Sequence, residues 1–151
     1  MSTRREARER VMQAVYAFTV GVDNADHVIK TIIDGQMDDR EGIAFATKLF
    51  LRTLDATDET NALLEKYTQN WDISRIALVD RIVLRIAIVE LKYFPDIPPK
   101  VTINEAIEVA KRYSTERSGQ FVNGILDAIL ADLKAEGQLK KSGRGLIGLE
   151  G

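Results

Sequence analysis

The stretch from Ser74 to Phe94, which reads SRIALVDRIVLRIAIVELKYF, limits most strongly what this chain can fold into. Drawn as a helix, it carries apolar side chains on nearly every side, and a helix of that kind is normally buried inside a domain. A strand of this length would be far longer than usual. Its uninterrupted apolar runs never exceed four residues, which is too short for a membrane span. We therefore predict a core helix around which the other elements pack.

The polar residues of this stretch predict how the helix is oriented. Ser74, Arg81, Arg85 and Lys92 recur at spacings of seven, four and seven, so they share one side of a helix, which we expect to face water. Glu90 lies on the opposite side, among apolar neighbours. Because a buried carboxylate without a partner is costly, we expect Glu90 to form a structural hydrogen bond or ion pair rather than to act in catalysis.

Composition and charge narrow the classes of function. The chain has 151 residues, a formal net charge of −2 and a sequence pI of about 5.5, so it is no general binder of polyanions and any contact with nucleic acid must be local. It contains no cysteine, which excludes disulfides, thiolate zinc sites and cysteine nucleophiles. The start, MSTRREARER, lacks the apolar segment of a secretion signal. We expect a cytoplasmic protein without a membrane segment.

Capping patterns and helical periodicity predict further helices along the chain. In a capping pattern a polar side chain satisfies the free backbone N–H groups of a helix start. Such patterns occur at Thr3–Glu6, at Asp23 or Asn24, at Asp38–Glu41 and at Thr102–Glu105. The helical pattern after the third of these runs to about Asn70 and is either one long helix or two helices joined near Thr57.

The end of the chain is expected to hold one more helix and a tail. The polar break from Ser114 to Gly119 precedes the last helix, which we expect to carry Phe121 and Asn123 in its first turn. The whole is then an all-α, compact bundle of six or seven helices. Residues 1–136 form the predicted domain, and residues 137–151 are expected to be a flexible tail containing Gly and Lys.

The search for catalytic or metal-binding motifs leaves no candidate. Gly143, Gly145 and Gly148 spell G-x-G-x-x-G, but a dinucleotide site needs a strand before that motif and a helix after it. His27 is the only histidine, so a metal site is not expected. No phosphate-binding loop, nucleophile signature or H-E-x-x-H helix occurs. We expect no enzyme activity and no cofactor.

One flank of the first helix is a candidate for binding a polyanion. Arg5, Arg8, Met12 and Tyr16 lie along this flank, with Arg4 at its start. Residues 1–13 hold four arginines against two glutamates, a local excess of two positive charges in an acidic chain. Without other information, a solvated helix start with Glu–Arg pairs on its surface is the favoured explanation of the pattern.

Three segments resemble the NusB family of bacterial transcription antitermination factors. They read RREARERVMQAVYAF near the start, PPKVTINEAIEVAK after the core helix and QFVNGILDAI in the last helix. The similarity covers most of residues 3–133. It implies an all-α fold of two helical subdomains that binds single-stranded boxA RNA and pairs with NusE, a small-subunit ribosomal protein, within the antitermination complex on RNA polymerase. Ribosomal RNA operons are the implied setting.

The resemblance also implies roles for individual residues. Position by position, the RNA-binding residues of the family correspond to Arg4, Arg5, Arg8, Tyr16, Phe121 and Asn123. Arginine binds phosphate bidentately and aromatic rings stack on unpaired bases. Asp80 matches a position that is acidic in relatives and is assigned to the protein interface.

Two departures from the family pattern act in opposite directions. Glu6 and Glu9 interrupt the run of arginines and are expected to weaken RNA binding, whereas Arg117 stands where some relatives carry an acid and is expected to strengthen it. We expect the guanidinium of Arg8 and the ring of Phe121 to line a single groove.

Two other functions compete with this prediction. A related helical domain occurs as an RNA-binding accessory of RNA cytosine methyltransferases, although this chain is too short to hold their cofactor-binding domain as well. A homodimer in which the same helices bury each other, without RNA contact, is the third alternative.

Overall fold

The computed structural model of the chain describes residues 4–21, 24–69 and 76–149. These ranges contain seven α-helices, one π-helical segment and one 3₁₀ turn, and no strand within them. The helices are α1 (Arg4–Val20), α2 (Ala25–Val28), α3 (Arg40–Asp55), α4 (Thr57–Tyr67), α5 (Leu78–Tyr93), α6 (Pro99–Tyr113) and α7 (Glu116–Ala135), with the π-helical segment at Ile29–Asp34 and the 3₁₀ turn at Gly143–Leu146. The predicted all-α class is confirmed. None of the described helices is long and apolar enough to cross a membrane.

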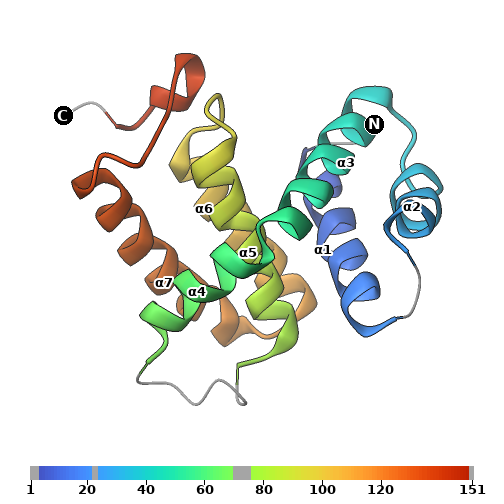
Figure 1. The fold of residues 1–151 in the computed structure, drawn as a ribbon, viewed down its shortest axis with the longest axis horizontal. Coiled ribbons are helices and arrows are strands. Elements are labelled where there is room, and N and C mark those ends of the chain that lie inside the picture. Colours follow the sequence, from blue (N-terminus) through green and yellow to red (C-terminus); the bar gives the residue numbers. More distant parts are fainter. Residues whose placement is uncertain (1–3, 22–23, 70–75, 150–151) are drawn as a thin grey trace.

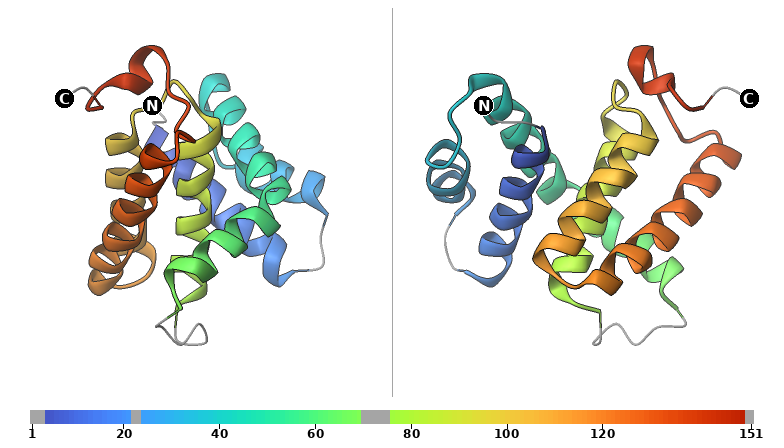
Figure 2. Two further views of the ribbon diagram at one scale, coloured as in Figure 1. Left: turned by 60° about the vertical axis from the view of Figure 1, so that its left-hand side comes forward. Right: turned by 180° about the vertical axis from the view of Figure 1, so that it is seen from behind.

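The helices form two groups that share α5 (Figure 1). One group holds α1, α2 and α3, and the other holds α4, α6 and α7. Between them, α5 packs against α1, α3, α4, α6 and α7. Seen from behind, α6 and α7 lie side by side (Figure 2). The two helical subdomains implied by the family resemblance are therefore present.

The central position of α5 confirms the predicted core helix over residues 78–93. Its side chains Ile82, Leu84, Ile88 and Leu91 are among the largest fully buried ones in the described residues. Burying such a side chain contributes about 1.5–3 kcal/mol relative to leaving it in water. Ser74, predicted to belong to the same helix, lies outside the described residues.

The prediction that one side of this helix faces water is wrong for Arg85 and Lys92. Arg85 is buried, and its guanidinium donates hydrogen bonds to the hydroxyls of Thr57 at 2.9 Å and Thr60 at 3.3 Å. Lys92 is partly buried and pairs with Glu59. The reason is that α4 packs along this side of α5 and supplies polar partners for the cations, which periodicity alone does not reveal.

Local capping accounts for the ends of several helices. Asn24 caps α2 by accepting from the N–H of His27, and Asp39 caps α3 by accepting from the N–H of Gly42. Both caps agree with the predicted signals. The helical pattern after Asp39 is two helices, with Ala56 at the junction. The predicted cap Thr3 lies outside the described residues.

Two predicted helix starts are placed differently by the structure. Thr102 does not begin a helix, because α6 already begins at Pro99, whose fixed φ and missing N–H suit a first helical turn. Helix α7 begins at Glu116 and is capped by Thr115 together with Ser118. Phe121 and Asn123 consequently lie in the second turn of α7, not in its first.

Residues after α7 also differ from the expected flexible tail. The chain turns at Gly137, where φ is +67°, and then runs across the ends of α5 and α6 (Figure 1). Leu139 packs against the core. The segment thus contributes contacts to the domain, because main-chain and lysine donors find carbonyl acceptors at the end of α5.

Candidate nucleic-acid interface

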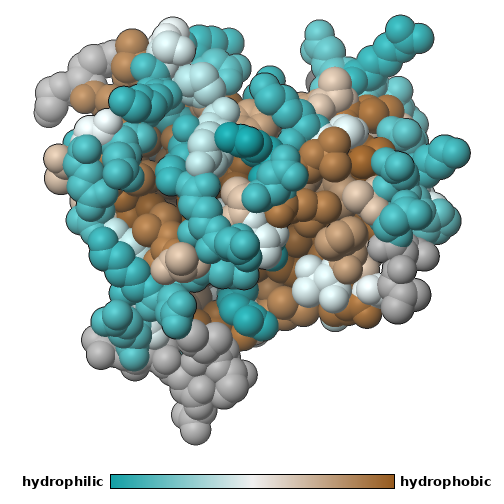
Figure 3. Space-filling model, viewed as in Figure 1, coloured by the Kyte–Doolittle hydropathy of each residue, from teal (hydrophilic) through white to brown (hydrophobic). Residues whose placement is uncertain are grey.

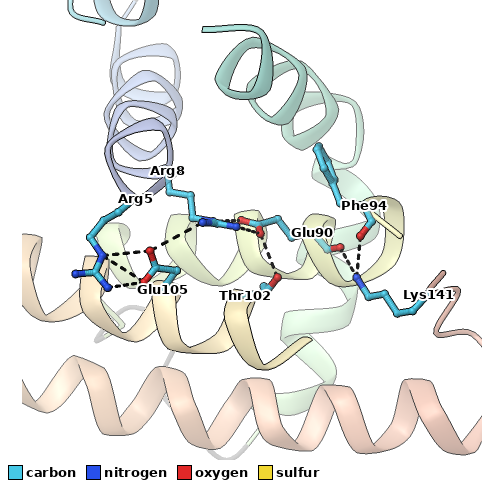
Figure 4. Close-up of polar contacts among 7 residues, drawn as sticks. All are labelled: Arg5, Arg8, Glu90, Phe94, Thr102, Glu105 and Lys141. Atoms are coloured by element: carbon cyan, nitrogen blue, oxygen red, sulfur yellow. Dashed lines mark hydrogen bonds and ion pairs between the residues drawn. The ribbon is translucent and has the colours of Figure 1, made fainter. Parts of the chain in front are cut away.

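A buried ion pair lies beneath the start of α1 (Figure 4). The guanidinium of Arg8 donates two hydrogen bonds to the carboxylate of Glu90, from Nε to Oε2 at 2.8 Å and from Nη2 to Oε1 at 2.7 Å. The hydroxyl of Thr102 donates to Oε1 of the same carboxylate at 3.1 Å. The two charged side chains are only 5% and 2% exposed. This confirms the prediction that Glu90 needs a structural partner.

The burial of Arg8 revises its predicted role. Burial by itself would lower the pKa of this guanidinium, but the hydrogen bonds and charge of Glu90 outweigh that effect and raise it. Arg8 is therefore a fixed cation whose donors face α5 and α6 rather than the surface. Its predicted role as a direct RNA contact does not agree with this position, since a phosphate would have to displace Glu90 inside the core.

Arg4 and Arg5, which precede Arg8 in α1, do reach the surface. Arg5, whose side chain is 51% exposed, binds Glu105 of α6 with Nη2 2.6 Å from Oε2. This hydrogen bond and the charge of Glu105 raise the pKa of Arg5. Arg4 is exposed, and its guanidinium lies 4.1 Å from the centre of the Phe45 ring. Such a cation–π contact contributes about 0.5–1 kcal/mol at an exposed site. Both cations are thus held in place by neighbours.

The two glutamates that interrupt the arginine run both interact with other groups of the protein. The carboxylate of Glu9 is mostly buried and faces α6, where Arg112 binds it at 3.0 Å. Its charge is therefore balanced by Arg112, and because Glu9 lies one helical turn after Arg5 it also attracts that arginine. We expect the pairing with Arg112 to reduce the weakening of RNA binding that was predicted for Glu9. Glu6 is partly buried and also has a partner.

Tyr16 provides an aromatic surface further along α1. It is 42% exposed and lies two helical turns beyond Arg8. Phe18 and Val20 of α1 and Leu51 of α3 are exposed as well. Apolar side chains accordingly gather over the half of the molecule that contains α1 and α3 (Figure 3). Exposed apolar surface of this kind marks places where another molecule can bind.

The first two turns of α7 contribute two of the predicted residues to the surface. Arg117 is exposed in the first turn. Asn123 is exposed and lines a groove of about 260 Å³ between α6 and α7, opposite Asn104 and beside Asp127. Amide groups at the rim of a groove can donate to and accept from a nucleotide.

Phe121 lies on a different side of α7. It is two residues from Asn123, hence about 200° away around the helix, and it packs against the core. Asp132 follows on nearly the same side of α7 as Phe121 and accepts a hydrogen bond from Tyr67 of α4. Phe121 therefore faces the α4 side. The expected groove lined jointly by Arg8 and Phe121 is not formed, because Arg8 is turned into the core.

Asp80, predicted for the protein interface, is only 7% exposed. Its Oδ2 accepts a hydrogen bond from the hydroxyl of Ser118 at 2.9 Å, which joins the start of α5 to the cap of α7. Its Oδ1 has no hydrogen-bond partner among the described residues. In the structure Asp80 is thus chiefly a link between two helix starts.

Three contributors to the site escaped sequence reasoning. Glu105 holds Arg5, Phe45 supports Arg4, and Lys141 donates from Nζ to the main-chain oxygens of Glu90 at 3.0 Å and Phe94 at 2.9 Å (Figure 4). Glu105 lies in the segment PPKVTINEAIEVAK, whose resemblance to the NusB family could have pointed to it. Nothing near Lys141 in sequence distinguishes it from a solvated lysine. No group of three metal-binding side chains occurs in residues 4–21, 24–69 and 76–149.

Lys141 also gives the protein a pH-dependent stability. Burial lowers the pKa of its ammonium to about 8, against the attraction of Glu90 and Asp96. In the unfolded chain the pKa returns to 10.5, so between these values the unfolded state binds more protons than the folded state. Stability must then rise with pH across this interval.

We therefore expect Lys141 to add to the free energy of unfolding as the pH rises from about 8 to about 10. Urea unfolding at several pH values measures this, and Lys141→Met should remove the rise. The interval ends near pH 10 because the raised pKa values of Tyr67 and Tyr93 reverse the trend above it. A wild-type curve that falls relative to the variant over the same interval would contradict the assignment.

The fold and the site define an all-α, two-subdomain protein that presents cations and an aromatic ring on its first helix and an amide groove between its last two. The NusB family profile matches residues 5–131. A transcription antitermination protein NusB from Salinibacter ruber is 48% identical over 151 residues, which cover 99% of this chain and 94% of the relative. The chain belongs to the NusB family of transcription antitermination proteins.

Solved structures agree with this membership. NusB of T. maritima superposes with a TM-score of 0.78 and 36% identity, covering 87% of this chain and 92% of the other. A chain from the crystal structure of antitermination factors NusB and NusE in complex with dsRNA gives a TM-score of 0.77 and 25% identity, covering 85% and 96%. The family resemblance seen in the sequence is thus confirmed.

Proposed function

We propose that the protein binds single-stranded boxA-type RNA together with NusE and helps assemble the antitermination complex on RNA polymerase, notably for ribosomal RNA operons. It acts as a non-enzymatic adaptor in the cytoplasm. Family membership is the observation that carries this proposal. The related complex of NusB and NusE with RNA supports it.

The proposed RNA surface differs from the set expected from sequence. Arg4 and Arg5 bind phosphate, Tyr16 stacks on an unpaired base, and Arg117 and Asn123 contact the strand at α7. Stacking on an aromatic ring contributes about 1–3 kcal/mol per base. Arg8 supports this surface from below, and Phe121 contributes through its exposed edge only.

The weak positive charge of this surface explains the need for a partner. Only a few exposed arginines face the RNA, in a chain whose net charge is −2. Since phosphate contacts supply most of the affinity for nucleic acid and weaken with salt, the protein alone should bind RNA modestly. A basic partner that holds the same strand raises the affinity without further arginines in this chain.

The direct test is the affinity for a fluorescent boxA RNA, measured by anisotropy with and without purified NusE. We expect NusE to strengthen binding by about 5- to 150-fold, the usual range of coupling between two ligands. A scrambled RNA of the same length is the control. Equal affinities with and without NusE, or equal affinities for the two RNAs, would contradict the proposal.

The exposed apolar side chains on α1 and α3 favour a second candidate, a homodimer that buries Phe18, Val20 and Leu51. Gel filtration with light scattering distinguishes the two. A monomer that forms a one-to-one complex with NusE supports the adaptor. A dimer that NusE does not dissociate supports the alternative.

A further inference from the structure

The segment after α7 contacts the domain at several points, although most of its side chains are exposed. We call residues Gln138–Leu149 the C-terminal strap. It begins where the N–H of Gln138 donates to the carbonyl of Leu133 at 2.9 Å, a usual way to end a helix. Gly143, with φ +55°, then allows the turn into the short 3₁₀ segment. At its end, Ile147 and Leu149 form a wall of the groove that holds Asn123.

Three residues attach the strap to the corner between α5 and α6. Lys141 donates to the carbonyls of Glu90 and Phe94, and the N–H of Ser142 donates to the carbonyl of Pro95 at 3.0 Å. Gly145 lies so close that a Cβ there would be 1.8 Å from the oxygen of Pro95. Gly145, the middle glycine of the G-x-G-x-x-G sequence, thus allows a tight contact between two stretches of main chain.

Lys141 binds the main-chain oxygens of Glu90 and Phe94. The side chains of these two residues support arginines of α1. The carboxylate of Glu90 holds Arg8. The ring of Phe94 packs edge-on against Phe45, with centroids 5.8 Å apart, and Phe45 lies under Arg4. Figure 4 shows the first of these paths, from Lys141 through Glu90 to Arg8 and on to Glu105 and Arg5.

We propose that Lys141 is a positioning residue for the exposed arginines of α1, and that the C-terminal strap thereby sets the RNA affinity of the protein. This inference rests on the proposed function. The ammonium is attracted to the negative end of α5 and donates to the carbonyls of Glu90 and Phe94, which also accept the backbone N–H groups of Phe94 and Ile97. By doing so it holds the last turn of α5, and with it the carboxylate of Glu90 and the ring of Phe94, at the places that Arg8 and Phe45 require.

A neighbouring lysine makes a matched control for this proposal. Lys140 is exposed, and Lys140→Met changes the net charge and adds the same side chain as Lys141→Met. We expect Lys141→Met to weaken binding of boxA RNA by about 3- to 10-fold, the range usual for residues that act through others. Lys140→Met should leave the affinity within about twofold. Equal affinities of the two variants would overturn the proposal.

A second variant separates positioning from direct phosphate contact. Gly145→Ala forces the strap away from Pro95 without changing any charge, and it should weaken RNA binding as Lys141→Met does. If only Lys141→Met weakens binding, Lys141 is itself a phosphate contact and the positioning role is refuted. Gly145→Ala also serves as the test if Lys141→Met does not fold.

Whether Lys141 holds Arg8 in place can be measured without RNA. The Nε–H of Arg8, held by a buried carboxylate, should give a slowly exchanging NMR signal in the wild type, and Lys141→Met should speed its exchange while Lys140→Met does not. An unchanged signal overturns the inference. If the wild type binds no RNA even with NusE, the proposed function fails, whatever the NMR result. The NMR measurement therefore distinguishes a failure of the positioning role from a failure of the proposed function.

A double-mutant cycle tests whether Lys141 acts through the ion pair of Arg8 and Glu90. In the background of Arg8→Met with Glu90→Met the proposed path through the ion pair is absent, so Lys141→Met should weaken RNA binding less than it does in the wild type. Fully additive effects would mean that Lys141 merely stabilises the domain, and would overturn the proposed path.

Discussion

Replacing Glu90 by leucine is expected to lower the free energy of unfolding by about 3–5 kcal/mol, the cost of leaving a buried charge without its partner. The guanidinium of Arg8 donates two hydrogen bonds to this carboxylate and is 5% exposed. Glu105 approaches the same guanidinium only to 4.0 Å. It cannot replace Glu90 without releasing Arg5, so the cation would remain largely uncompensated.

Urea unfolding followed by circular dichroism measures this loss, and two further variants test its origin. The pair Arg8→Met with Glu90→Met removes both charges and should recover most of the stability, because well-packed apolar side chains often replace a buried ion pair without loss. Glu108→Leu, at an exposed position of α6, should change the stability by less than about 0.5 kcal/mol. A small loss in Glu90→Leu together with a large loss in the double variant would contradict this account.

Reversing the charges of Arg4 and Arg5 is expected to weaken binding of boxA RNA by about 10- to 100-fold at low salt, since each arginine contributes a charge-assisted hydrogen bond to phosphate. The slope of log affinity against log salt should become shallower by about 0.7 for each phosphate that the variant no longer binds. Anisotropy titrations of Arg4→Glu with Arg5→Glu over a range of salt concentrations measure both quantities.

The matched control reverses two exposed lysines outside the proposed RNA surface, Lys30 and Lys66. Lys30→Glu with Lys66→Glu changes the net charge by the same amount, so its effect reports the overall charge alone. We expect a loss of less than about threefold, because separated surface charges are screened beyond about 10 Å at ordinary salt. Equal losses in the two double variants would remove α1 from the RNA site.

The elements of this fold could be predicted from sequence wherever a signal is local. The apolar pattern around Ile82 and Ile88 is independent of the neighbours that eventually cover it, so the core helix was identifiable. Caps at Asn24 and Asp39 depend on residues three positions apart. Glu90 was recognisable as a residue in need of a partner because its surroundings within α5 are apolar.

The direction of a charged side chain could not be predicted in the same way. Arg5 and Arg8 lie on one flank of α1 and read alike in the sequence, yet Arg5 reaches water and Arg8 enters the core. The difference arises because Glu90 and Thr102, distant in sequence, stand opposite Arg8. Arg85 shows the same effect, since α4 supplies the hydroxyl groups that make its burial tolerable.

The sequence by itself determined that this protein is a bundle of helices around α5 and that its first helix begins with an excess of positive charge, because helical periodicity and capping are set by neighbours along the chain. Only the tertiary structure decided which arginines remain exposed, which side of α7 carries Phe121, and that the residues after Gly137 are seated on α5. Each of these depends on hydrogen bonds and contacts between segments far apart in sequence, which form only when the helices pack.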